Sequence, residues 1–181
     1  MKRLTAIITF ALITISFSDT FAQYDYNWAV GFRVGEPLGL NIRKYFRNGD
    51  RAFDVNLGTY GFLYGHQRKY NKGEYRQAGV MIQGIYLFHR EVGKKGNFHV
   101  YYGFGGQINS RKHYRVVDFG TSNERKLSLG PTATAGMEIK LPNQPNLAIF
   151  LDAGGYLEAL PLPFFPNAQV STGLRLNIDK L

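Results

Sequence analysis

The stretch "NFHVYYGFGGQIN", residues 97–109, decides the fold because its residues alternate between two kinds of side chain. In an extended chain, successive side chains point to opposite faces, so every second residue shares a face. One face would carry large apolar side chains, namely Phe98, Val100, Tyr102, Phe104 and Ile108. The other would carry small or polar residues, namely His99, Tyr101, Gly103, Gly105, Gln107 and Asn109. The pattern predicts a strand between an apolar environment and a crowded polar one.

The same alternation recurs along the chain, whereas no helical period does. It is found in seven further stretches: residues 28–35, 40–46, 52–58, 78–89, 127–140, 147–158 and 168–178. The links after the second, fourth and sixth strands are short, and those after the third, fifth and seventh are long. Turns at one end and loops at the other are typical of antiparallel neighbours, and an even number of strands can close on itself. We therefore predict an all-β fold, an eight-stranded antiparallel up-and-down transmembrane β-barrel.

Residues 1–22 predict an export signal. Lys2 and Arg3 supply the positive start, "LTAIITFALITI" the apolar stretch, and Ala22 ends a small-residue cleavage site before Gln23. The apolar run is shorter than the roughly 18 residues that a spanning helix needs. We expect residues 23–181 to form a single barrel domain in the outer membrane. The chain contains no cysteine, which excludes disulfides, cysteine-ligated metals and a thiol nucleophile.

The charged residues of the predicted strands lie on the face opposite the large apolar side chains. They are Arg33, Arg43, Asp54, Glu138, Asp152, Glu158 and Arg175, and Gln83 shares that face. Lysine is nearly missing there, although the water-exposed face of a secreted protein would be expected to carry it. An eight-stranded barrel has an interior only just wide enough for side chains. A few charges of both signs among glycines therefore predict a paired network inside the barrel.

Large aromatic residues of the apolar face gather at one level. Trp28, Phe46, Phe53, Phe88 and Phe98 all lie at the strand ends nearest the N-terminus and the short turns. This distribution is typical of an aromatic girdle at a membrane interface. The strands, at some ten residues, also match the ~9 to 11 needed to cross a bilayer at a tilt.

An export signal followed by "WAVGFRVGEPLGLNIRKYF", "GIYLFH" and "VYYGFGGQI" resembles the small outer-membrane β-barrel proteins common in Bacteroidetes-type bacteria, in the broad class of OmpA- and OmpX-like barrels. The resemblance implies a monomer embedded in outer-membrane lipid, with a structural, adhesive or envelope-interaction role and no catalysis. Such barrels usually finish on an aromatic residue. This chain departs from the pattern, with Ile178 where that ring would stand and Leu181 last.

The two longest predicted loops are basic. Arg68, Lys69 and Lys72 fall in the second loop, and Arg111, Lys112 and Arg115 in the third. Facing outward, these side chains would meet lipopolysaccharide phosphates, which arginine can bind with two hydrogen bonds. A plain soluble loop is the alternative, and nucleic acid is a poor partner for an exported chain.

Two other functions fit parts of the sequence. A secreted or periplasmic lipocalin-like barrel would turn its apolar faces inward around a small ligand. A lipid A-modifying enzyme would need a histidine and a serine with a carboxylate, and His99 and Ser128 are the candidates. No pair of histidines has the spacing of a helical metal site. We expect no catalytic residue, metal or cofactor.

Overall fold

The computed structural model describes residues 26–61, 68–70, 73–75, 79–92, 96–117, 120–161 and 164–179. The predicted export signal lies outside these residues. The strands are β1 (Tyr26–Glu36), β2 (Leu38–Phe46), β3 (Arg51–Tyr60), β4 (Arg68–Tyr70), β5 (Gly73–Tyr75), β6 (Gly79–Glu91), β7 (Phe98–Val117), β8 (Gly120–Leu141), β9 (Gln144–Glu158) and β10 (Phe165–Asp179), with one 3₁₀ turn, η1 (Arg47–Gly49). Within this part of the chain, no helix has the length and apolar character needed to cross a membrane.

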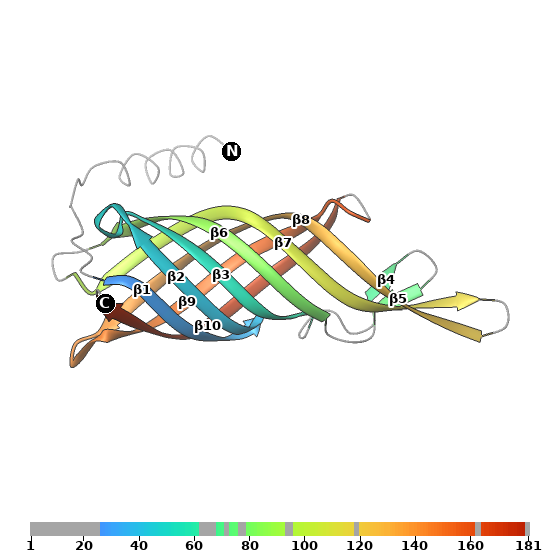
Figure 1. The fold of residues 1–181 in the computed structure, drawn as a ribbon, viewed down its shortest axis with the longest axis horizontal. Helices are drawn as coiled ribbons and strands as arrows, with labels where there is room; N and C mark the ends of the chain where they lie inside the picture. Colours follow the sequence, from blue (N-terminus) through green and yellow to red (C-terminus); the bar gives the residue numbers. More distant parts are fainter. Residues whose placement is uncertain are drawn as a thin grey trace, which may run out of the picture.

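Eight of the strands close into a barrel. Around it the order is β1, β2, β3, β6, β7, β8, β9 and β10, and β10 pairs with β1 to complete the ring. Every neighbouring pair is antiparallel. The strands wind obliquely around the barrel, with the start of β1 and the end of β10 at the same end (Figure 1). The predicted eight-stranded up-and-down barrel is confirmed.

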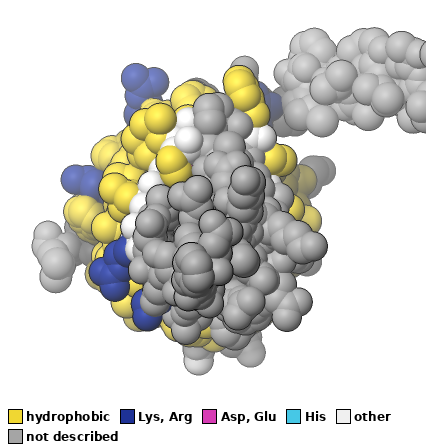
Figure 2. Space-filling view, turned by 90° about the vertical axis from the view of Figure 1, so that its right-hand side faces the viewer, with side chains coloured by type: hydrophobic (Ala, Val, Ile, Leu, Met, Phe, Trp, Pro, Cys, Tyr) yellow, Lys and Arg dark blue, Asp and Glu magenta, His cyan; other side chains and the backbone are white. Residues whose placement is uncertain are grey.

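The alternation seen in residues 97–109 sets which way each side chain of β7 points. His99 and Tyr101 are buried inside the barrel, at 2% and 3% exposed, whereas Tyr102 and Phe104 on the outer wall are 59% and 62% exposed. The other seven barrel strands repeat this arrangement. In the view from the loop end, hydrophobic side chains cover much of the wall visible around the undescribed residues (Figure 2).

The structure corrects the predicted third loop. Residues 110–126 were expected to be an irregular connection, but β7 and β8 stay paired as far as Val117 and Gly120. Because β6 pairs with β7 only up to Ser110, the tip of the β7–β8 hairpin projects beyond the barrel (Figure 1). The short strands β4 and β5 lie within the predicted second loop, and β5 adds to the edge of β7. Backbone pairing therefore continues where polar composition alone indicated loops.

Candidate functional site: the polar interior

Two arginines and two carboxylates form an ionic cluster inside the barrel. Arg43 donates to both carboxylate oxygens of Asp54, from Nε to Oδ1 at 2.5 Å and from Nη2 to Oδ2 at 2.8 Å. Its Nη1 also donates to Glu138 Oε2 at 3.3 Å, and Arg175 Nη1 donates to the same oxygen. Asp54 is 3% exposed, and the other three side chains are fully buried. Each of these charges is stabilised by its partners, because a buried charge without an opposite charge costs several kcal/mol of folding free energy.

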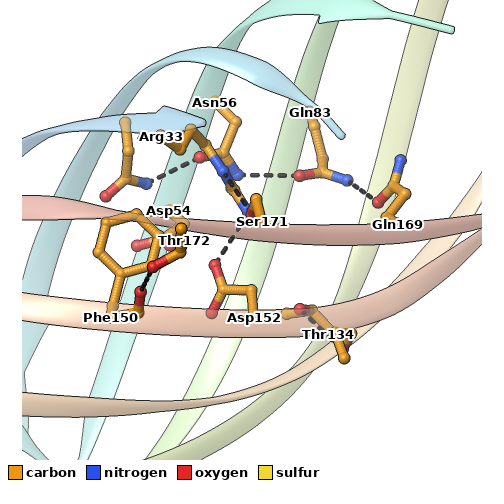
Figure 3. Close-up of polar contacts among 12 residues, drawn as sticks. Arg33, Asp54, Asn56, Gln83, Thr134, Phe150, Asp152, Gln169, Ser171 and Thr172 are labelled. Carbon is orange, nitrogen blue, oxygen red and sulfur yellow. Dashed lines mark hydrogen bonds and ion pairs between the residues drawn. The ribbon is translucent and has the colours of Figure 1, made fainter. Parts of the chain in front are cut away.

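A third arginine pairs with Asp152. Arg33 Nη2 lies 2.8 Å from Asp152 Oδ2 and 2.6 Å from Ser171 Oγ (Figure 3). The Tyr101 hydroxyl donates to the other carboxylate oxygen of Asp152. The two groups together contain three arginines and three carboxylates, so their formal charges cancel. This balance allows the charges to stay in an interior that excludes most water.

Aromatic rings and a glycine support the arginines. The guanidinium carbon of Arg175 lies 4.3 Å from the centre of the Phe150 ring, and that of Arg43 lies 4.5 Å from the centre of the Tyr101 ring. Both contacts are within the range of cation–π attraction. A Cβ atom at Gly136 would overlap the Asp152 carboxylate and lie 2.7 Å from Tyr101. Glycine on the inner face therefore makes room for the ionic groups.

A chain of hydrogen bonds runs from the ionic cluster towards the loop end of the barrel. Amide side chains suit such a chain because each one both donates and accepts. The links, in order from donor to acceptor, are Arg175 to Asn41 (2.9 Å), Asn41 to Asn56 (2.8 Å), Asn56 to Gln83 (2.9 Å), Gln83 to Gln107 (2.8 Å), Gln107 to Asn109 (2.7 Å) and Asn109 to Ser128 (3.1 Å). Gln169 joins it, accepting from Gln83 at 3.0 Å (Figure 3). The interior is thus filled by side chains of all eight barrel strands.

The predicted interior residues all lie inside the barrel. Arg33, Arg43, Asp54, Gln83, Glu138, Asp152, Glu158 and Arg175 are each no more than 5% exposed. Seven of them take part in the two ionic groups and the amide chain. Glu158 ends β9, opposite Phe165 of β10.

Sequence reasoning missed an apolar layer inside the barrel at the short-turn end. Ala29, Tyr45, Ala52, Ile85, Leu87 and Tyr101 form this buried cluster. Tyr101 is predicted to point inward, whereas Ile85 and Leu87 are large apolar residues on the face that residues 78–89 were predicted to keep small or polar. Phe150 was not assigned to the interior either, although it shares the face of Asp152. Ile85, Leu87 and Phe150 each lie an even number of residues from an inward-facing polar residue of the same strand. This alternation could have placed all three inside the barrel.

The predicted girdle residues lie on the outer wall. Trp28, Phe46 and Phe53 are 43%, 38% and 42% exposed, and Phe88 and Phe98 are half-buried. Phe88 stacks on Tyr102, with ring centres 5.2 Å apart.

The predicted lipopolysaccharide-contacting residues are only partly described. Lys112 is exposed on the projecting part of β7. Arg111 and Arg115 belong to β7, and Arg68 and Lys69 to β4, but their side chains lie outside the described part, as does Lys72 altogether. The structure therefore corrects their setting from loop to strand for five of the six residues.

The candidate catalytic pair does not come together. His99 lies opposite Glu138 and Ser128 opposite Asn109, which places His99 and Ser128 ten register positions apart along β8. At about 3.3 Å per residue, they are on the order of 33 Å from each other. His89 and His99 are buried at the short-turn end, where His89 stacks on Tyr101 at 4.9 Å. Among the described residues, no group of three or more His, Asp and Glu side chains is placed to hold a metal ion.

Comparison with known proteins identifies the fold. The N-terminal β-barrel domain of OprF from Pseudomonas aeruginosa matches with a TM-score of 0.59 and 11% identity, covering 84% of this chain and 98% of that domain. Ail, the attachment invasion locus protein of Yersinia pestis, matches with a TM-score of 0.47 and 14% identity, covering 83% of this chain and 93% of that one. Neisserial surface protein A matches with a TM-score of 0.44 and 17% identity, covering 83% and 93%. No family model and no curated protein sequence matches the chain. At 11% identity the likeness to the OprF domain establishes the barrel fold.

Proposed function

We propose that this chain, after removal of residues 1–22, is a monomeric outer-membrane barrel of the Bacteroidetes type, with a structural, adhesive or envelope-interaction role and no catalysis. The observation that carries the proposal is the inversion of the barrel wall. Phe32 and Leu174 point outward and are each 51% exposed, whereas Arg33 and Arg175 beside them are 5% and 0% exposed. A continuous apolar wall of this kind is far larger than the patches that water-soluble monomers expose. A bilayer is the solvent that suits it.

The same observation argues against a lipocalin-like barrel. A lipocalin-like protein needs an apolar cavity for its ligand, and here the corresponding volume is occupied by arginine–carboxylate pairs and hydrogen-bonded amides. The separation of His99 from Ser128 argues likewise against the lipid A-modifying enzyme. The polar interior is better understood as the filling that holds the barrel in shape.

The projecting β7–β8 hairpin supports a contact with lipopolysaccharide. Its register places Arg111 opposite Lys126 and Lys112 opposite Arg125. Like charges directly opposite each other destabilise a strand pair. A polyanionic partner would relieve this repulsion, and lipid A phosphates have the required charge. We propose that Arg68, Lys69, Lys72 and Arg115 contribute to the same contact.

Detergent dependence of the purified mature chain tests the membrane proposal. We expect a folded, monodisperse protein in detergent micelles that migrates faster on a gel before boiling than after, and aggregation when detergent is removed. A protein that stays folded and monodisperse in plain buffer would contradict the proposal.

Binding to lipopolysaccharide tests the proposed role of the hairpin. The double variant Lys112→Gln/Arg125→Gln removes one of the like-charge pairs, and both native side chains are exposed. We expect weaker binding of the detergent-solubilised barrel to immobilised lipopolysaccharide than for the wild type, with the difference shrinking as salt is raised. Arg90→Gln, which removes an exposed positive charge at the opposite end of the barrel, is the matched control. Equal binding of wild type and double variant would refute this contact.

A further inference from the structure

Basic side chains also gather on the outer wall at the short-turn end of the barrel. Lys44, Arg47 and Arg90 are exposed, and Arg51 is half-exposed. The described carboxylates close to them in sequence are Asp50 and Glu91, both half-buried. This rim is therefore positively charged, whereas in the two ionic groups inside the barrel the arginines and carboxylates are equal in number.

Two of these cations lie on rings of the aromatic girdle. Lys44 Nζ is 4.9 Å from the centre of the Trp28 ring and 5.8 Å from that of Phe46. The guanidinium carbon of Arg51 lies 4.6 Å from the centre of the Phe88 ring. Cation–π contact holds a charge at a ring face but leaves its N–H donors available for an acceptor.

The strand register arranges cations and rings alternately. Lys44 lies between Trp28 and Phe53 on the neighbouring strands. Arg51 lies between Phe46 and Phe88 in the same way. We call Trp28, Lys44, Phe46, Arg51 and Phe88 the rim patch.

Lys44 and Arg51 have no carboxylate partner among the described residues; the ion pairs given between described residues join the interior arginines to Asp54, Glu138 and Asp152. Arg51 Nη1 donates to the carbonyl oxygen of Asp50 at 2.9 Å, and the described residues take up none of its other guanidinium N–H groups. The interior arginines differ from Lys44 and Arg51, since each of them forms an ion pair with a carboxylate. Exposed cations held in place without an anion are suited to binding one from outside.

We propose that the rim patch binds the phosphate of an anionic phospholipid in the leaflet at the short-turn end. This inference rests on the proposed outer-membrane location, where short turns face the periplasm. Girdle aromatics lie at the depth of the lipid headgroups, so the two cations beside them lie at the level of the phosphates. Lipid acyl chains would then run along the apolar wall towards Val30 and Ile42, which are 44% and 37% exposed.

Trp28 allows a direct test because it is the only tryptophan in the chain. The mature protein is reconstituted in phosphatidylcholine vesicles that contain rising fractions of brominated phosphatidylglycerol or, separately, brominated phosphatidylcholine. Bromine quenches tryptophan fluorescence only at short range, so the two quenching curves give the relative affinity of both lipids for the surroundings of Trp28. We expect about a fivefold preference for the anionic lipid, as a basic group near an anionic headgroup would produce.

Variants of the rim patch test whether it causes the preference for the anionic lipid. Lys44→Gln/Arg51→Gln should bring the preference to within twofold of unity, and Lys44→Arg should retain it. Lys112→Gln at the opposite end is the control and should leave it unchanged. Equal quenching by the two lipids in the wild type, or a preference that the double variant keeps, would overturn the inference while the barrel remains inserted. Absence of quenching by either lipid would instead overturn the proposed membrane location.

Discussion

Adjacent residues of β10 meet opposite environments. Leu174 is 51% exposed on the outer wall, and Arg175 is fully buried among Asp54, Glu138 and Asn41. The difference arises only from position parity, because neighbouring side chains of a strand point to opposite sides of the sheet. Leu174 is therefore suited to an apolar environment and Arg175 to the polar interior. Placing either residue in the other environment would cost free energy.

Substitutions at these two positions should both destabilise the barrel, for different reasons. Leu174→Arg should cost about 2 to 4 kcal/mol if the position lies near the bilayer midplane. Arg175→Leu should cost about 3 to 5 kcal/mol, because it leaves Glu138 with Arg43 alone. Urea unfolding in lipid vesicles, followed by Trp28 fluorescence, measures both changes.

Two controls distinguish the causes. Leu174→Ala should cost less than Leu174→Arg, since it places no charge in lipid. Arg175→Leu/Glu138→Leu should recover part of the stability lost in Arg175→Leu, since it removes both charges together. Wild-type stability in both Leu174→Arg and Arg175→Leu would mean that the wall is not inverted.

Neighbouring glycines of β7 offer a second test at this scale. A Cβ atom at Gly105, on the inner face, would overlap the backbone of Gly84 and lie 2.8 Å from Ile85 Cα. A Cβ atom at Gly106, on the outer face, would meet nothing within 4 Å. Gly105→Ala should lower stability by about 1 to 3 kcal/mol, whereas Gly106→Ala should be neutral or raise it by up to about 1 kcal/mol. Urea unfolding in lipid vesicles measures both changes in stability. A larger loss of stability for Gly106→Ala than for Gly105→Ala would contradict the packing described for β7.

At the scale of elements, β7 and β8 have two parts with separate roles. Residues 99–110 of β7 pair with both β6 and β8 and belong to the barrel, whereas residues 111–117 extend beyond β6. The barrel part follows from the alternation in sequence. The projecting part was missed because its charged residues hide the apolar period, and polar composition alone does not separate a paired hairpin from a loop.

Replacing residues 111–126 by an Asn-Gly turn tests this division. The barrel pairing of β7 and β8 ends with Ser110 opposite Leu127, so a tight turn can follow there. We expect the shortened chain to fold, with the heat-dependent gel migration of the wild type, and to lose affinity for lipopolysaccharide. A chain that no longer folds would show that the hairpin belongs to the structural unit of the barrel.

At the scale of the whole molecule, the fold and the orientation of its wall could be predicted, but the partners inside could not. Alternation assigned Arg43, Asp54, Glu138 and Arg175 to one face, and the interior of an eight-stranded barrel is too narrow to keep them apart. Which arginine binds which carboxylate depends on the strand stagger, which no local pattern encodes. The positions of Phe150 and Leu87 along their strands do predict that they point inward, but their packing beside Gly173 and Gly103 again depends on the strand stagger.

Spin labelling of the outer wall tests the inversion most directly. The chain has no cysteine, so Phe32→Cys, Leu57→Cys and Leu174→Cys each provide a unique attachment site, and Lys112→Cys on the projecting hairpin is the control. In lipid vesicles we expect nitroxides at the three wall positions to collide often with oxygen, which concentrates in the hydrocarbon, and rarely with a water-soluble nickel complex. The nitroxide at residue 112 should show the reverse. Wall positions as accessible to the nickel complex as residue 112 would contradict the lipid-facing wall.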